Sequence, residues 1–272
     1  MPSWFRSKPV VPVVRLTGII GQGTALRPGL SLAGVEGALD KAFRIKAPAV
    51  ALVVNSPGGS PVQSSLIATR VRALAAKNGR TVVAFVEDVA ASGGYWLAAA
   101  ADEIVADANS IVGSIGVVTA TFGFPELLDK LGVERRVYTV GENKAILDPF
   151  RPEREADVAI LRSVQADVHD AFVAAVRERR GGRLGDDPDL FTGRFWSARS
   201  GLAIGLVDRI GEIRSVVKER YGERVQLRNI PTARPSFWRA RLGIGLDPQG
   251  ALSADGLIGA ARSHLMWERY GL

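Results

Sequence analysis

The chain contains no cysteine among its 272 residues and only two histidines, His169 and His264. The absence of cysteine excludes disulfide bonds, thiolate zinc sites and a cysteine nucleophile, and it leaves the redox compartment open. With so few histidines, a Ser-His-Asp triad or a histidine-ligated metal site would have to use one of these two. His169 lies in a long amphipathic helical pattern and His264 in the tail, so we expect both to be surface or interface residues.

The sequence also shows no segment typical of membrane insertion or export. The first residues, MPSWFRSKP, carry two prolines and two basic residues where a signal peptide would need an apolar stretch. An uncharged run at residues 108–125 contains Asn109, Gly113 and Pro125, which make a poor lipid-facing helix. We therefore expect no transmembrane anchor and a location in the cytoplasm or at the periphery of the inner membrane.

The net charge of +7 and the pI near 10.0 raise the question of an anionic partner. The basic residues are nevertheless interleaved with acidic ones, as in Arg177-Glu178-Arg179, and no basic helix with interleaved aromatic residues is present. This pattern is typical of a solvated surface. We expect no nucleic-acid partner and at most peripheral contact with a membrane.

Apolar, β-rich runs alternate with helical patterns, which predicts an α/β domain. Strands are expected at 10–16, 49–54 and 81–86, with helices at 32–43 and 61–78 between them. The second helix should begin at its proline and end at Asn78-Gly79, a dipeptide suited to a left-handed helix end. Later strands are expected at 103–106, 111–118 and 136–140, and later helices at 126–131, at 153–180 and on both sides of 205–208.

Two of the expected strands end in glycine pairs, Gly58-Gly59 and Gly93-Gly94, and Ser92 directly precedes the second pair. Glycines at strand ends let backbone N–H groups approach a ligand, and the following helix N-termini add positive partial charge. Together the pairs would form an oxyanion hole, whereas either alone is an ordinary turn. Ala90 occupies the position of the first glycine of a G-x-S-x-G motif, so an α/β-hydrolase elbow is disfavoured.

A serine hydroxyl needs a base before it can act as a nucleophile. Without a suitable histidine, the remaining candidate is a lysine that burial has made neutral, because a free lysine has a pKa of ~10.4. Lys144 stands just past an expected strand among small and apolar neighbours. From these residues alone, both a catalytic lysine and an ordinary loop lysine remain open.

At this point the chain resembles the signal peptide peptidase A family of serine proteases, peptidase family S49, in its short bacterial form. Each matching element is weak, but their order along residues 10 to 220 is specific. The elements are Asn55-Ser56-Pro57-Gly58-Gly59, Ala91-Ser92-Gly93-Gly94-Tyr95, Val112-Gly113-Ser114-Ile115-Gly116-Val117, Gly141-Glu142-Asn143-Lys144, and Phe191-Thr192-Gly193-Arg194 followed by Gly205-Leu206-Val207-Asp208.

The resemblance implies a Ser-Lys dyad that needs neither a metal nor a cofactor. Carried over to this chain, Ser92 would be the nucleophile and Lys144 the general base. The backbone N–H groups of Gly59 and Gly93 would form the oxyanion hole, and Ser114 would orient the lysine amine. A turn serine that satisfies the local backbone is the alternative for Ser114.

The resemblance also implies a ClpP/crotonase-like α/β fold, here as one domain at 10–225 with a C-terminal extension at 226–272 that docks onto another subunit or a membrane surface. Expected substrates are remnant signal peptides and other apolar or unfolded peptides. The expected assembly is a homo-oligomeric ring or dome, in which the two dyad residues could come from neighbouring subunits. We expect an apolar substrate groove lined by Tyr95, Ile115 and Val117.

Two other functions remain open on the same scaffold. A crotonase-type acyl-CoA enzyme would also use glycine amides as an oxyanion hole, but it would need a carboxylate beside the hole. Asp88 is the nearest in sequence to Gly93 and lies on the wrong side of the turn. A non-catalytic scaffold or peptide-binding assembly protein would make no chemical use of Ser92 and Lys144.

Overall fold

The computed structural model describes residues 8–21, 29–232, 261 and 264–272. Within them, an eight-stranded sheet runs in the order β6-β5-β3-β2-β1-β8, with β4 beside β3 and β7 beside β4. Every strand pair is parallel except β5 with β6. The strands are β1 (Val10–Thr17), β2 (Ala49–Ser56), β3 (Thr81–Ala91), β4 (Glu103–Ala106), β5 (Ile111–Gly113), β6 (Phe195–Ser197), β7 (Arg209–Ile210) and β8 (Gln226–Ile230).

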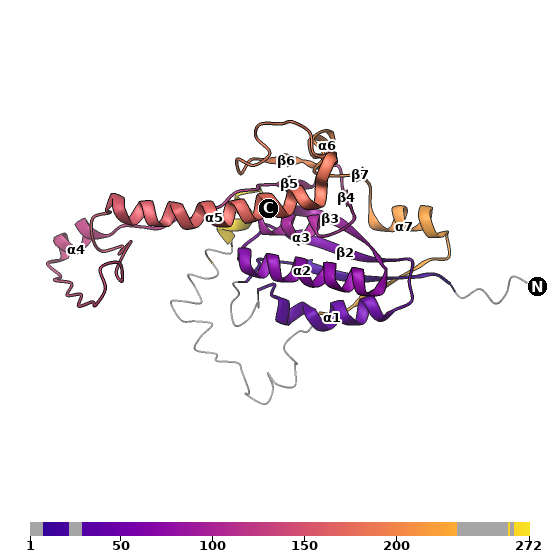
Figure 1. The fold of residues 1–272 in the computed structure, drawn as a ribbon, viewed down its shortest axis with the longest axis horizontal. Helices are drawn as coiled ribbons and strands as arrows, with labels where there is room; N and C mark the ends of the chain where they lie inside the picture. The colour runs from indigo at the N-terminus through magenta and orange to yellow at the C-terminus, as the bar shows by residue number, and fades with distance from the viewer. Residues whose placement is uncertain (1–7, 22–28, 233–260, 262–263) are drawn as a thin grey trace, which may run out of the picture. The chain divides into compact units, whose positions relative to one another are not determined.

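Helices alternate with strands along the first half of the chain, which confirms the predicted α/β class (Figure 1). The helices expected on both sides of 205–208 are also present. The helices are α1 (Leu32–Arg44), α2 (Pro61–Asn78), α3 (Gly93–Ala99), α4 (Pro125–Leu131), α5 (Glu155–Arg180), α6 (Ala198–Ala203) and α7 (Ile213–Tyr221).

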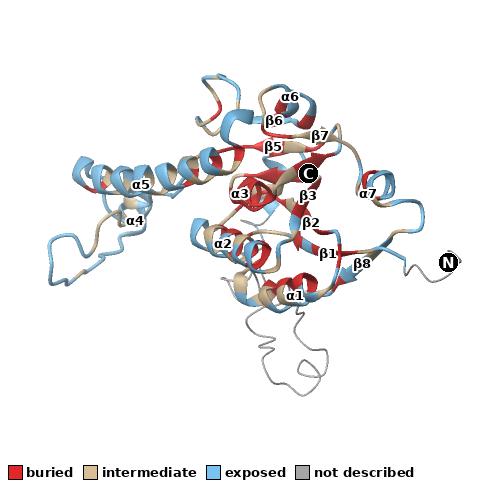
Figure 2. Cartoon of the chain, turned by 45° about the vertical axis from the view of Figure 1, so that its right-hand side comes forward, coloured by how far each residue is buried: buried red, intermediate tan, exposed pale blue. Residues whose placement is uncertain are grey.

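The central strands are buried on both faces, as their almost continuous apolar sequences predict. Along β2, Val50, Leu52 and Val54 belong to the core that also contains the apolar sides of α1, α2 and α3. Ala51 and Val53 point the other way and pack with α7. The red, buried positions in Figure 2 follow these strands and the helix sides that cover them.

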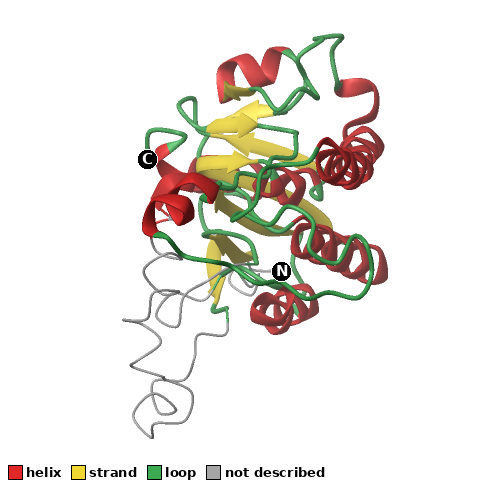
Figure 3. Ribbon diagram, turned by 90° about the vertical axis from the view of Figure 1, so that its left-hand side faces the viewer, coloured by secondary structure: helices red, strands yellow, loops and turns green. Residues whose placement is uncertain are grey.

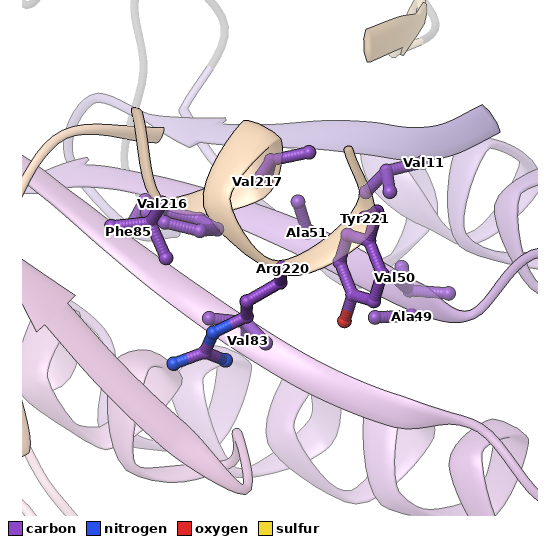
Figure 4. Close-up of a pocket in the computed structure, with 10 residues that line it drawn as sticks. All are labelled: Val11, Ala49, Val50, Ala51, Val83, Phe85, Val216, Val217, Arg220 and Tyr221. Carbon is purple, nitrogen blue, oxygen red and sulfur yellow. The ribbon is translucent and has the colours of Figure 1, made fainter. Parts of the chain in front are cut away.

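Helix α7 packs tightly on its face of the sheet. The space between them, shown in Figure 4, has a volume of about 10 Å³ and is lined by apolar side chains that include Phe85 and Val216. Arg220 at its rim forms an ion pair with Glu103. A space of this size holds at most one water molecule, so it has no room for a ligand.

The ends of α2 follow the sequence signals. Pro61 opens the helix, and the Ser60 hydroxyl accepts a hydrogen bond of 3.3 Å from the N–H of Gln63. Gly79 closes it in the left-handed region, at φ +57°. The predicted stop at Asn78-Gly79 is confirmed.

The described chain forms two compact units, one made of residues within 1–116 and 172–272 and the other of residues 117–171. The expected boundary between 225 and 226 stays a prediction, although β8 joins the sheet beside β1. The second unit contains α4 and most of α5, and many of its apolar side chains are exposed.

Two expected strands differ from the structure. The strand expected at 111–118 ends at Gly113, because Gly113 and Ser114 both have positive φ and turn the chain out of the sheet. No strand forms at 136–140. A strand needs a hydrogen-bonding neighbour, and the structure shows none for these residues within 117–171.

An ion pair connects the C-terminal end of α5 to Asp208, which lies just before β7. The side chain of Arg180 is 1% exposed, and it donates hydrogen bonds to Asp208 at 2.7 Å and to the carbonyl of Gly205. Asp208 also accepts from the N–H of Ile104 at 2.7 Å. Partial burial acts to raise the pKa of Asp208, but the hydrogen bonds from Arg180 and Ile104 outweigh it and hold the pKa below its ordinary value.

We expect Asp208→Asn to lower the free energy of unfolding by about 2–3 kcal/mol at pH 7, because it leaves the Arg180 guanidinium buried without its counter-charge. The native pKa of Asp208 is lowered, so this stabilisation is complete above the ordinary carboxyl pKa of ~3.9 and is lost as the pH falls below it. Urea unfolding at several pH values should show the variant and the wild type converging in acid.

The matched control is Glu219→Gln, which removes one partner of the exposed ion pair with Arg209. We expect no measurable change, because solvent screens exposed pairs. Equal effects of the two substitutions would contradict a special role for the Arg180–Asp208 pair.

Candidate active site

Ser92 occupies a strained position between β3 and α3. Its backbone lies at φ +52° and ψ −125°, a region that side-chain-bearing residues rarely adopt, at a cost of roughly 1–3 kcal/mol. Its N–H donates to the carbonyl of Gly113 at 2.8 Å, and its own carbonyl accepts from the N–H groups of Tyr95 and Trp96. These hydrogen bonds hold the half-buried serine at the carboxyl end of the sheet, where its hydroxyl can meet a substrate.

A bulge in β3 brings the chain to this position. Val86 pairs with Val54, but the next pair joins Ala90 to Ser56, so β3 contains two extra residues. Across the bulge, β3 changes its partner from β4 to β5. The hydroxyl of Ser110 donates to the carbonyl of Glu87 at 2.5 Å, which satisfies a backbone group inside the bulge.

The turn after β2 requires glycine. Gly58 and Gly59 have φ values of +107° and +141°. The N–H of Ile20 donates to the carbonyl of Gly58, and the N–H of Ser60 donates to the carbonyl of Ile20, both at 2.8 Å. This pairing leaves the N–H of Gly59 facing away from Ile20. A methyl group at Gly59 would overlap the carbonyl of Ile20, so no larger residue fits.

The two glycine turns lie against each other beside the serine. A Cβ atom added to Gly58 would lie 2.8 Å from the Cβ of Ser92 and 3.0 Å from the nitrogen of Gly93. Within the described residues, the N–H groups of Gly59 and Gly93 donate no hydrogen bond. Two free N–H groups next to a hydroxyl can stabilise a negative oxygen that forms when the hydroxyl attacks a carbonyl. The structure thus brings Ser92, Gly59 and Gly93 together, as the sequence predicts, while their roles stay predictions.

Ser114 lies next to this group and is 4% exposed. Its backbone is also left-handed, at φ +54°, and its N–H donates to the carbonyl of Arg194 at 2.7 Å. The hydroxyl of Tyr270 donates to the Ser114 hydroxyl oxygen at 3.2 Å. Tyr270 is not among the site residues expected from the sequence, which predicts for its segment only docking onto another subunit or a membrane surface. No periodic pattern or motif marks it, because the contact joins residues 156 positions apart.

Lys144 belongs to the other compact unit. Its N–H donates a hydrogen bond to the carbonyl of Gly141, and this bond closes a turn. Its side chain is exposed in the single chain, so the burial expected for a neutral lysine is not present there. A catalytic role for Lys144 therefore stays a prediction and requires an environment that removes it from water.

The expected groove lining is wrong for two of its three residues. Tyr95 and Ile115 are fully buried in the core, whereas Val117 is exposed. The hydroxyl of Tyr95 donates to the carbonyl of Leu206 at 2.9 Å, and burial raises its pKa. Tyr95 lies in the first turn of α3 and Ile115 follows β5, and both side chains pack in the core beneath the sheet's helices.

The amide of Asn55 donates to the carboxylate of Asp88, and exposed His264 pairs with Glu268 at 2.9 Å. Nowhere in the described ranges do three side chains of the kinds that bind metals gather closely enough to hold an ion. None of the described helices has both the length and the apolar character needed to cross a bilayer.

The chain is similar to known peptidases. A model of peptidase family S49 matches residues 75–226. The chain is 32% identical over 198 residues to "Putative protease slr0021" of Synechocystis sp., covering 73% of this chain and 68% of that protein. It is 33% identical over 162 residues to "Putative signal peptide peptidase SppA" of Enterococcus faecium, covering 60% of this chain and 47% of that protein.

A longer relative carries a different name. The chain is 52% identical over 282 residues, along its whole length, to "Na(+)/H(+) antiporter NhaA" of Brucella abortus. The match spans only 38% of that protein. The name describes the longer protein, so it is not transferred to this chain.

The packing of Gly93 allows a direct test of the site geometry. A methyl group at Gly93 would overlap the hydroxyl oxygen of Ser64, which is buried and donates to the carbonyl of Ser60. We expect Gly93→Ala to lower the free energy of unfolding by about 1–3 kcal/mol, as overpacking does. The same substitution should be less damaging when Ser64→Ala has removed that oxygen.

A double-mutant cycle in urea measures this coupling. The control pairs Gly93→Ala with Ser215→Ala, which removes an exposed hydroxyl that donates to the carbonyl of Glu212. Equal destabilisation by Gly93→Ala in all three backgrounds would show that Gly93 does not pack against Ser64 as the structure has it.

Proposed function

Because the chain belongs to peptidase family S49, we propose that it is a serine endopeptidase in which Ser92 is the nucleophile and Lys144 the general base. The family model covers more than half of the chain, including both residues. The observation that carries the proposal is the strained Ser92 beside the free N–H groups of Gly59 and Gly93. A protein that only needed a helix start would gain nothing from this strain.

The proposed chemistry needs only these groups. The neutral amine of Lys144 takes the proton of the Ser92 hydroxyl while Oγ attacks the peptide carbonyl carbon. The N–H groups of Gly59 and Gly93 bind the resulting oxyanion, and each such donor typically contributes about 3 kcal/mol in the transition state. The ammonium then protonates the leaving amine, and a water molecule, deprotonated by the same amine, hydrolyses the acyl-enzyme.

We propose that the substrates are apolar or unfolded peptides, such as remnant signal peptides. The similarity to a protein named as a signal peptide peptidase supports this class. A chain must be unfolded to reach the site, because the oxyanion donors are backbone groups in tight turns and Gly93 is buried.

We further propose a homo-oligomer, in which the second compact unit of one chain packs on another copy. This unit exposes large apolar side chains to solvent, with Phe122 at 79%, Tyr138 at 89% and Val140 at 97%. Apolar surface of this kind is removed from water in stable assemblies. Lys144 lies on the same unit, so a second copy that covers it would also provide the burial that a neutral amine requires.

We expect Ser92→Ala and Lys144→Met each to lower kcat/KM on an apolar fluorogenic peptide by at least about 10⁴-fold, because each removes one half of the proton transfer. The wild type should become more active from pH 6 to pH 9, since only the neutral amine can accept a proton. Lys130→Met is the matched control, because it removes an exposed lysine of the same unit.

The results of these assays distinguish the proposed peptidase from a scaffold protein and from a crotonase-type enzyme. Full peptidase activity of Ser92→Ala, or a flat pH profile, would contradict the Ser-Lys dyad. No peptide cleavage by the wild type would favour a scaffold, and turnover of an acyl-CoA thioester or enoyl-CoA would favour a crotonase-type enzyme.

Mixing the two inactive variants tests the assembly. If the dyad joins two subunits, an equal mixture that exchanges subunits should regain about a quarter of the wild-type activity, because a site is intact when the serine and the lysine come from different variants. Light scattering should show an oligomer before and after mixing. A mixture that exchanges subunits and stays inactive would place both residues in one chain.

A further inference from the structure

The segment formed by residues 264–272 lies against the sheet beside the candidate active site. Trp267 and Tyr270 pack with Val89 and Ala91 of β3, the strand that leads to Ser92. Figure 3 shows this segment as a helix near the C-terminus, beside the strands of the sheet. Tyr270 is 8% exposed, so it is part of the packed structure.

Two further contacts, one of its ring and one of its backbone, hold Tyr270 in place. Phe195 of β6 meets it edge to face, with centroids 5.3 Å apart and planes at 77°. The N–H of Tyr270 donates to the carbonyl of Trp267 at 2.9 Å. A ring held in this way has a fixed hydroxyl, and the described residues offer that hydroxyl one hydrogen-bond partner, the oxygen of Ser114 at 3.2 Å.

Ser114 connects this hydroxyl to the nucleophile. The carbonyl of the preceding residue, Gly113, accepts the N–H of Ser92. Ser114 is held in a left-handed backbone and buried, so its side chain has little freedom apart from rotation about Cα–Cβ. The hydrogen bond from Tyr270 restricts that rotation.

We propose that Tyr270 is a positioning residue for the general base and that it acts through Ser114. This inference rests on the proposed function and on the expectation, drawn from the family resemblance, that the Ser114 hydroxyl orients the lysine amine. A hydroxyl oxygen that accepts a hydrogen bond becomes a stronger donor and a weaker acceptor. A weaker acceptor stabilises an ammonium less, so the hydrogen bond from Tyr270 favours the neutral amine that catalysis needs.

The test is Tyr270→Phe in the full chain, which removes the hydroxyl and keeps the ring. Loss of one neutral hydrogen bond predicts a kcat about threefold to tenfold lower at pH 7, with KM unchanged. The rise of activity with pH should move to higher pH, so that the variant approaches the wild type in alkali. Tyr221→Phe, in the last turn of α7 and in a cluster separate from that of Tyr270, is the matched control and should leave both the rate and the pH profile unchanged.

A double-mutant cycle with Ser114→Ala tests whether the effect of Tyr270 passes through Ser114. If Tyr270 acts through Ser114, Tyr270→Phe should change kcat less than about twofold once Ser114 is alanine. Independent effects of the two substitutions would overturn the inference. So would an increase in activity, because it would make the segment an inhibitory cover.

Ser92→Ala, measured in the same assay, distinguishes a failure of the inference on Tyr270 from a failure of the proposed peptidase function. An inactive Ser92→Ala with a Tyr270→Phe variant identical to the wild type overturns the inference and leaves the peptidase standing. An active Ser92→Ala overturns both. Unfolding midpoints of all variants, measured first, set an assay temperature at which each is folded.

Discussion

The strained, positive-φ backbone of Ser92 is the constraint on which the rest of the site depends. A residue with a side chain stays in this conformation only when the surrounding structure holds it there. The hydrogen bond to Gly113 fixes it on one side, and the first turn of α3 fixes it on the other. The bulge in β3, the glycine turn at Gly58-Gly59 and the short strand β5 all serve to maintain this arrangement.

Helix α5 stabilises the same region from a distance. Phe172 stacks on Trp96 of α3 with ring centroids 4.7 Å apart. Arg179 donates to the carbonyl of Ala101 just after α3, and Arg180 binds Asp208. The helix that follows Ser92 is thus anchored at its side and at its end. The segment at 264–272 adds a similar support on the β5 side, where Tyr270 reaches Ser114.

Much of the fold and part of the site were predictable from local patterns. The buried strands β1, β2 and β3 contain long apolar runs, and α2 carries its start and stop signals in sequence. The expectation of a strand at 136–140 was wrong, because an alternating pattern cannot show whether a neighbouring strand exists to pair with it. The groove lining was wrong because a sequence does not show which side of the short helix α3, or of the turn after β5, meets the core.

The sequence by itself determined the α/β class, the two glycine turns and the serine between them, because these follow from the conformations that individual residues allow. Only the tertiary structure decided that the N–H groups of Gly59 and Gly93 meet beside Ser92, that Ser92 and Ser114 both have positive φ, and that Tyr270 reaches Ser114. These contacts join residues far apart in the chain. Their geometry depends on how the strands are ordered in the sheet, and no short pattern contains that order.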